Sequence, residues 1–203
     1  MESTVVKYSY FDFCHTVVKE FTLSNFVSFV EKNEKLYFTM IKNKLFKRDV
    51  EARFLHLWKY KNRETISLAN AYAKTLVDKL NEEVLSSMKS DIDEGFKIVL
   101  VSAGLELYIK PFFELLGISI MHYITSFVED SGDDSPIFVS MYAEKKLESI
   151  KELELKLAPS MTKGYSDHIS DLPMLLHVDV PIVITGPNSK LVAVANRNSW
   201  KII

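Results

Sequence analysis

Residues 18–90 contain neither proline nor glycine, and this feature constrains the fold more than any other in the sequence. Apolar residues recur in this block at helical spacing, as at Phe26, Phe29 and Val30. We therefore expect about four helices there. An apolar run at residues 5–13 precedes the block, and its β-branched and aromatic residues predict a strand.

From residue 91 to the carboxyl terminus, short apolar runs alternate with amphipathic stretches. Strands that alternate with helices form βα units, which build a mainly parallel sheet. The chain is therefore predicted to be an α/β protein, in which residues 17–90 form a helical cap inserted into a core made of residues 1–16 and 91–203. Strands are expected at 97–102, 118–124, 137–142, 161–167, 181–185 and 200–203, helices at 105–116, 143–157, 171–176 and 189–195, and a loop tip at 131–136.

The composition is that of a soluble globular protein, with 47% hydrophobic and 26% charged residues. The net charge of −2 provides no basic field, so we expect no nucleic-acid partner. Cys14 is the single cysteine, which fits a reducing compartment. The first residues lack the order of a signal peptide, and the sequence has no run of about 18 apolar residues. The expected location is the cytoplasm, without a membrane partner.

Two carboxylates, Asp167 and Asp171, follow the strand expected at 161–167. This places both at the carboxyl edge of the predicted sheet, where α/β folds bind their ligands. Anionic oxygens that converge there favour a hard cation, Mg²⁺ before Zn²⁺. An ordinary turn, in which Ser170 or Asp171 caps the next helix, is the alternative. This segment alone leaves the two interpretations equally open.

Two further polar residues are expected at the same edge, because Asp12 ends the first strand and Ser102 ends the strand at 97–102. A charged helix opens with Lys145-Lys146. The order and spacing of these features resemble the haloacid dehalogenase superfamily. The resemblance is greatest to its phosphoserine-phosphatase-like branch, which carries a small helical cap after the first motif.

The resemblance covers nearly the whole chain. The run Val99–Ala103, followed by a helix and by Leu116-Gly117, fits the branch well. The strongest match to the branch pattern Tyr-Ser-Asp-Ser-x-x-Asp-Leu-Pro-Leu-Leu is the segment Tyr165-Ser166-Asp167-His168-Ile169-Ser170-Asp171-Leu172-Pro173-Met174-Leu175. The resemblance implies a Rossmann-like three-layer α/β/α core with a mainly parallel sheet and an inserted α-helical cap.

The resemblance also implies a Mg²⁺ site and a nucleophile. Asp12 is the expected nucleophile, which forms an aspartyl-phosphate and binds Mg²⁺ through its second oxygen. Asp167 is expected to hold the same metal. Asp171 is expected either to bind the metal directly or to support its ligands.

Phosphate contacts are implied for two other segments. Ser102 and Ala103 are expected to contact the phosphoryl group. Lys146 is expected to neutralise the phosphate and the nucleophile together, because two anions approach each other only when cations screen them. Lys146 is preferred to Lys145, since Lys146-Leu147-x-x-Ile150 fits the opening of the branch's helix.

The chain departs from the family at Cys14, where the phosphatases usually carry the Asp that protonates the leaving oxygen and then deprotonates water. The family draws a metal ligand from the backbone carbonyl here, so the metal site is retained. A positioned acid/base contributes about 10²–10⁴-fold, and a thiol with a pKa of about 8.5 is a poorer match than a carboxylic acid. His15, which replaces the usual glycine, is an alternative acid/base if its side chain points inward, although neighbours on an extended strand face opposite sides. Cys14 as a buried filler is the simpler alternative.

These residues together predict a Mg²⁺-dependent phosphohydrolase that acts on a small phosphorylated metabolite through Asp12 and prefers good leaving groups such as aryl or acyl phosphates. Two alternatives stay open. In the first, catalysis is lost and the protein binds a phosphorylated ligand or partner; in the second, a phosphotransferase passes the group to an acceptor other than water. A phosphatase of the Cys-x₅-Arg type is excluded, because the sixth residue after Cys14 is Glu20.

Overall fold

The computed structural model describes residues 6–33, 50–58, 63–129, 136–187 and 189–203. Its centre is a seven-stranded sheet with the order β4-β3-β2-β1-β5-β6-β7. All neighbouring strands are parallel except β3 and β4, which pair antiparallel at one edge. The strands are β1 (Lys7–Phe11), β2 (Phe96–Leu105), β3 (His122–Glu129), β4 (Ile137–Val139), β5 (Met161–Ser166), β6 (Val180–Val183) and β7 (Lys201–Ile202). The predicted α/β class with a mainly parallel sheet is therefore confirmed.

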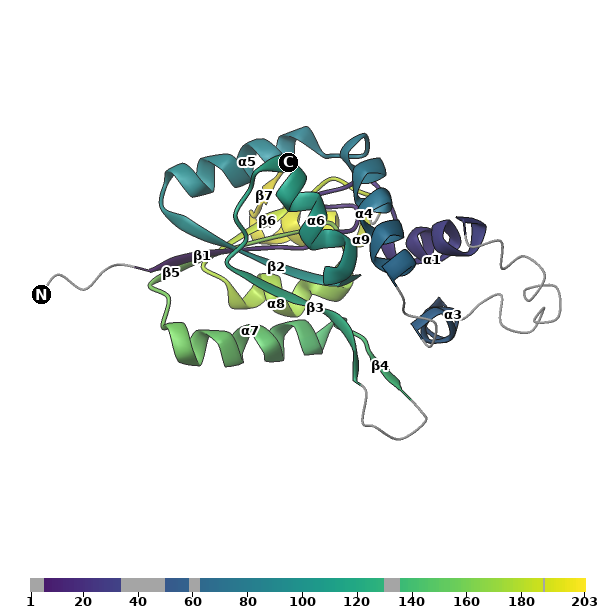
Figure 1. The fold of residues 1–203 in the computed structure, drawn as a ribbon. Helices are drawn as coiled ribbons and strands as arrows, with labels where there is room; N and C mark the ends of the chain where they lie inside the picture. Colours follow the sequence, from purple (N-terminus) through teal and green to yellow (C-terminus); the bar gives the residue numbers. More distant parts are fainter. Residues whose placement is uncertain (1–5, 34–49, 59–62, 130–135, 188) are drawn as a thin grey trace, which may run out of the picture.

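Helices cover both faces of this sheet, which makes three layers (Figure 1). Helices α5 and α6 lie on one face, and α7 and α8 lie on the other. Helices α1, α3 and α4 lie to the right in Figure 1, beyond the carboxyl ends of the strands. The helices are α1 (Thr22–Asn33), α3 (Val50–Trp58), α4 (Arg63–Val77), α5 (Glu82–Asp93), α6 (Glu106–Leu116), α7 (Glu144–Leu157), α8 (Leu172–His177) and α9 (Ser189–Asn198), with a 3₁₀ turn at Ile169–Asp171.

Side-chain alternation along the central strands divides the core into two parts. Phe11, Ile98 and Leu100 belong to a cluster that includes residues of α1, α4, α5 and α6. Tyr10 and Val99 face the opposite way, into a cluster with residues of α7, α8 and α9. This period of two is the pattern of strands that are buried on both faces.

The predicted elements of the carboxyl half are present, with one clear shift. The strand expected at 118–124 begins at His122, where it pairs with Val99 of β2. Gly117 ends α6 in the left-handed conformation, with φ 65°, and the two isoleucines that follow pack against the core before the strand starts. The loop tip expected at 131–136 falls, except for its last residue, outside the described residues.

The division into a core and a cap at 17–90 stays a prediction. Four helices of that block are described, α1, α3, α4 and α5. Helix α5 packs against the sheet, because Asp91 accepts hydrogen bonds from Ser9 of β1 and Tyr165 of β5. In space, α5 is thus part of the layer that covers the sheet.

Candidate active site

Two of the expected acids leave adjacent strands at the same edge of the sheet. Asp12 directly follows β1, and Asp167 directly follows β5. The two strands are parallel neighbours in which Phe11 pairs with Tyr165, and the backbone N–H of Asp12 donates to the Tyr165 carbonyl at 3.0 Å. Because the strands end in register, both carboxylates point into the space beyond the carboxyl edge.

Lys146, in the first turn of α7, joins two acids of this cluster. Its ammonium donates to Asp12 Oδ1 at 2.7 Å and to Asp171 Oδ2 at 2.8 Å. The side chain is buried, with 3% of the residue exposed. The hydroxyl of Ser166 also donates to Asp171 Oδ2, at 2.7 Å. Asp171 is thus held between a strand residue and the lysine.

Thr16 joins the other pair of acids. Its hydroxyl oxygen lies 3.3 Å from Asp12 Oδ2 and 3.3 Å from Asp167 Oδ1. It also accepts the backbone N–H of Asp167 at 3.1 Å. A hydroxyl has a single proton, so Thr16 donates to either carboxylate but not to both at once. Asp12 and Asp167 therefore lie side by side, one on each side of Thr16.

Sequence reasoning did not identify Thr16, Ser166 or Gly186 as parts of the site. The available signal for Thr16 was its place four residues after Asp12, and Ser166 directly precedes Asp167. Gly186 follows β6, and a Cβ there would come within 2.9 Å of the Asp167 carboxylate. Only a glycine permits the backbone to approach that acid so closely.

Among the residues that the structure describes, the three buried carboxylates of the cluster share one ammonium, so their charges do not balance. Burial raises the pKa of Asp12 to about 7; Lys146 opposes this shift, and Asp171 and Asp167 add to it. Burial also raises the pKa of Asp167, to about 6, against the hydrogen bond from Thr16. Burial alone would lower the pKa of Lys146, but Asp12 and Asp171 raise it above its ordinary value. The cluster thus carries a surplus of negative charge that an additional cation would compensate.

The donor atoms fit a magnesium ion. Within the residues that the structure describes, no set of three or more His, Cys, Asp or Glu side chains forms a ready cage for a metal. Mg²⁺ does not need one, because one or two carboxylates, together with waters and substrate phosphate, commonly complete its shell. Asp12 and Asp167, which flank Thr16, supply two such carboxylates. Asp171 is already engaged by Lys146 and Ser166.

The expected phosphate-binding segment lies on the next strand. Ser102 is buried on β2, beside β1, and its hydroxyl accepts the N–H of Gly104 at 2.9 Å. The Ala103 carbonyl accepts the hydroxyl of Ser126 at 2.8 Å. A Cβ at Gly104 would come within 2.7 Å of the Tyr108 hydroxyl, so a glycine is needed there. Both hydrogen bonds fix the irregular last residues of β2, while phosphate contact by Ser102 and Ala103 stays a prediction.

Cys14 contacts the beginning of α1. Its sulfur lies 2.9 Å from the hydroxyl of Thr22, which in turn lies 3.0 Å from the Tyr108 hydroxyl. Burial, together with the nearby charge of Asp12, raises the pKa of the Cys14 thiol to about 11. The thiol therefore keeps its proton at neutral pH.

His15 does not lie on extended backbone, so that expectation is wrong. Its φ of 54° is in the left-handed region, because the chain turns sharply after β1. The alternation of neighbouring side chains in a strand does not apply to such a turn. The His15 ring instead packs edge-on against Phe21, with 4.1 Å between the ring centroids.

The sequence matches the family model of the haloacid dehalogenase-like hydrolases over residues 10–176. The chain therefore belongs to this family, and the expected resemblance is confirmed. Comparison with curated protein sequences gives no significant match.

Solved structures show the same fold at low sequence identity. A protein of unknown function from Bordetella pertussis Tohama I superposes with a TM-score of 0.76 at 17% identity, over 98% of this chain and 99% of that one. A phosphoserine phosphohydrolase-like protein from Francisella tularensis gives 0.66 at 17% identity, over 98% and 95%. A substrate-bound phosphoserine phosphatase gives 0.60 at 15% identity, over 100% and 94%.

The family model places the chain among the haloacid dehalogenase-like hydrolases, and the solved structures show the same fold. The α/β sheet with its flanking helices is the fold of that family, and the acid cluster lies where α/β folds bind their ligands. None of the helices in the described parts of the chain combines the length and the apolar character needed to cross a bilayer.

Proposed function

We propose that the chain is a Mg²⁺-dependent phosphohydrolase that acts on a small phosphomonoester through an aspartyl-phosphate on Asp12. The observation that carries this proposal is the environment of the Asp12 carboxylate. One of its oxygens faces the ammonium of Lys146, and the other faces Asp167 across the Thr16 hydroxyl. A carboxylate that serves as both nucleophile and metal ligand needs two such different surroundings, one for each of its oxygens.

The two oxygens of Asp12 have separate tasks in this proposal. Oδ2, on the side of Asp167, is the oxygen assigned to Mg²⁺, and Oδ1 attacks the phosphorus. The Oδ1–P bond forms as the ester P–O bond breaks, and Lys146 neutralises the charge that gathers on the transferred group. Bound Mg²⁺ supplies further charge neutralisation. Ser102 and Ala103 are assigned to the phosphoryl oxygens, as the resemblance implies.

Cys14 is assigned to proton transfer. Its thiol is protonated at neutral pH, so it has a proton to give to the leaving oxygen. A raised thiol pKa makes Cys14 a weak acid, so the substrates least affected are those whose leaving oxygen departs without a proton. We therefore propose aryl or acyl phosphates as preferred substrates, and a cytoplasmic location that suits the single cysteine.

The test of this function is phosphate release from an aryl phosphate in the presence of Mg²⁺, with wild type and Asp12→Asn measured side by side. The proposal predicts release by wild type that depends on Mg²⁺ and disappears in the variant. Equal rates in the two proteins would contradict it.

A second candidate function rests on Cys14 as well. A thiol in place of the usual acid is compatible with a protein that has kept the fold and the phosphate site but lost turnover. Such a protein binds a phosphorylated ligand or partner without consuming it. It would bind an aryl phosphonate in a Mg²⁺-dependent way while releasing no phosphate from the matching ester.

A further inference from the structure

Four ring-bearing side chains lie beside the acid cluster, and the proposed chemistry does not use them. Two directly follow residues of the site: His15 follows Cys14, and His168 follows Asp167. The others lie in the segments that enter α1 and α7 from the same edge of the sheet. We call this set the aromatic rim, and it consists of His15, Phe21, Tyr142 and His168.

The rings of the rim contact one another in two pairs. The His15 and Phe21 rings meet edge to face, with 4.1 Å between centroids and 82° between planes. The Tyr142 and His168 rings are tilted by 53°, with 6.4 Å between centroids. His15 directly precedes Thr16, His168 directly follows Asp167, and the Thr16 hydroxyl contacts both the carboxylate and the backbone N–H of Asp167. The two ring pairs therefore flank one contact of the acid cluster.

Two rings of the rim face solvent, although they are apolar. Phe21 is 63% exposed and Tyr142 is 52% exposed, while Phe26, Tyr72 and Tyr108 are buried in the core. Exposed rings contribute little to folding but offer a large contact area to a ligand. Their position beside the acid cluster makes a bound molecule the simplest explanation for their exposure.

We propose that the aromatic rim binds the leaving group of the substrate, and that this group carries an aromatic ring attached to the phosphate oxygen directly or through one carbon. This inference rests on the proposed function, since it places the ring next to the phosphate site. The short reach follows from His15 and His168, which directly adjoin site residues in sequence. Tilted and edge-on contacts with flat rings are the geometry that aromatic side chains prefer.

The experiment compares two ligands that differ only in aromaticity. Benzylphosphonate and cyclohexylmethylphosphonate cannot be hydrolysed at the phosphorus–carbon bond, and their dissociation constants are measured by calorimetry in the presence of Mg²⁺. Aromatic contacts add about 2- to 10-fold in affinity beyond area burial. Wild type is expected to prefer benzylphosphonate by a factor in this range.

Matched variants locate the preference. Phe21→Leu and Tyr142→Leu remove one ring each and keep an apolar side chain, and each should bring the affinity ratio close to one. Phe127→Leu is the control. Phe127 is 48% exposed and lines a separate groove of about 420 Å³ beside α3, α4 and α6. The inference is overturned if wild type binds neither ligand, shows no preference, or loses its preference in Phe127→Leu.

Two further measurements distinguish a failure of this inference from a failure of the proposed function on which it rests. A nucleoside 5′-monophosphate has its ring beyond the sugar, so its affinity should not depend on Phe21. If Phe21→Leu weakens the binding of the nucleotide but not of benzylphosphonate, the claim that the rim binds a ring close to the phosphate is overturned. Phosphate release measures the proposed function independently of these affinities. A preference for benzylphosphonate without phosphate release would support the proposed role of the rim and contradict the proposed hydrolase function. Phosphate release that depends on Asp12, without a preference for benzylphosphonate, would contradict the proposed role of the rim alone.

Discussion

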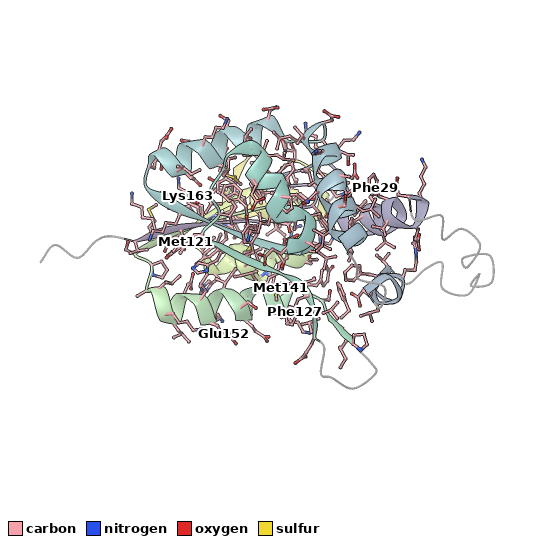
Figure 2. The ribbon with its side chains drawn as sticks, in the orientation of Figure 1. Phe29, Met121, Phe127, Met141, Glu152 and Lys163 are labelled. Carbon is pink, nitrogen blue, oxygen red and sulfur yellow. The ribbon has the colours of Figure 1, made fainter. Side chains whose placement is uncertain are left out.

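A buried carboxylate on α5 and the cluster of three buried carboxylates at the carboxyl edge both contact the same sheet, and the charges around them are arranged in opposite ways. Asp91 on α5 is 2% exposed and accepts from Ser9 at 2.7 Å, from Tyr165 at 2.8 Å and from the ammonium of Lys163 at 2.6 Å. Figure 2 shows Lys163 on the side of the molecule away from α1. Asp91 thus accepts from two hydroxyls and one ammonium. Lys163 also contacts Glu94 at 2.9 Å, but Glu94 is exposed, so Asp91 is the one buried acid among these two partners of Lys163.

The acid cluster at the carboxyl edge has the opposite balance. In the described parts of the chain, Lys146 is the one ammonium beside Asp12, Asp167 and Asp171, and burial raises the pKa of Asp12 and of Asp167. A folded protein gains nothing from such a surplus unless a ligand compensates it. The comparison teaches that a satisfied buried acid fastens a helix to a sheet, whereas an unsatisfied cluster marks a site.

The largest expected difference between the two groups is in turnover. Asp12→Asn should lower phosphate release by at least about 10³-fold, because it removes the nucleophile. The same change should leave the free energy of unfolding within about 1 kcal/mol, or raise it, since one of three like charges disappears. Phosphate release and urea unfolding check the two parts. A strongly destabilised but active variant would reverse the assignment of the two groups.

Asp91 should show the opposite behaviour. Asp91→Ala breaks a buried ion pair and leaves two hydroxyls without their acceptor, so it should lower the free energy of unfolding by about 3 kcal/mol. Asp93→Ala, on the exposed side of the same helix, should change it by less than about 0.5 kcal/mol. Chemical unfolding of both variants makes the measurement. Equal stability of Asp91→Ala and wild type would show that the Asp91 contacts do not fasten α5.

Cys14→Asp sharpens the account of the site. A carboxylic acid at this position should raise the turnover of an alkyl phosphate by about 10²-fold, since alkoxides leave only with a proton. Cys14→Ser, which removes the thiol without adding an acid, serves as the control and should give no gain. Rates measured with alkyl and aryl phosphates make the test. Unchanged or lower alkyl turnover in Cys14→Asp would mean that Cys14 does not occupy the acid position.

The smallest expected effect is the pH dependence of metal binding. The folded-state pKa values of Asp12 and Asp167, about 7 and about 6, lie above those of unfolded acids. These protons therefore stabilise the metal-free fold below about pH 4, and that stability is lost as the pH rises through 6 and 7. Mg²⁺ needs the ionised acids, so its stabilisation should be larger at pH 7.5 than at pH 5.5 by about 1–2 kcal/mol.

Thermal unfolding with and without Mg²⁺ at the two pH values measures this difference. Asp167→Asn should reduce it, because one of the two assigned metal ligands is lost. The same stabilisation by Mg²⁺ at both pH values would show that the metal does not bind at these acids.

Much of the architecture follows from the sequence because local pattern and strand order decide it. Alternating apolar runs predict the strands, and acids directly after two of them predict a shared edge. The proximity of Asp12, Lys146 and Asp171 follows from this logic, while their chemical roles stay predictions. The family follows from the ordered set of motifs, and the family model confirms it.

Other features depend on three-dimensional contacts that no local pattern encodes. The texture of residues 18–90 is uniform, so it does not reveal that α5 packs on the sheet through Asp91. The link through Thr16 requires the chain to turn directly after β1, and that turn also puts His15 in the left-handed region. The start of β3 is set by its pairing with β2 and not by its own apolar residues.

The central claim is that Asp12 becomes phosphorylated while buried acids and Lys146 surround it. Its most direct test is the intact mass of the protein after acid quenching of a reaction with acetyl phosphate and Mg²⁺, followed by peptide mapping. The account predicts a gain of one phosphoryl group on the peptide that contains Asp12, and its absence from Asp12→Asn. Phosphate release by wild type with no label on that peptide, or an equal label in the variant, would contradict the account.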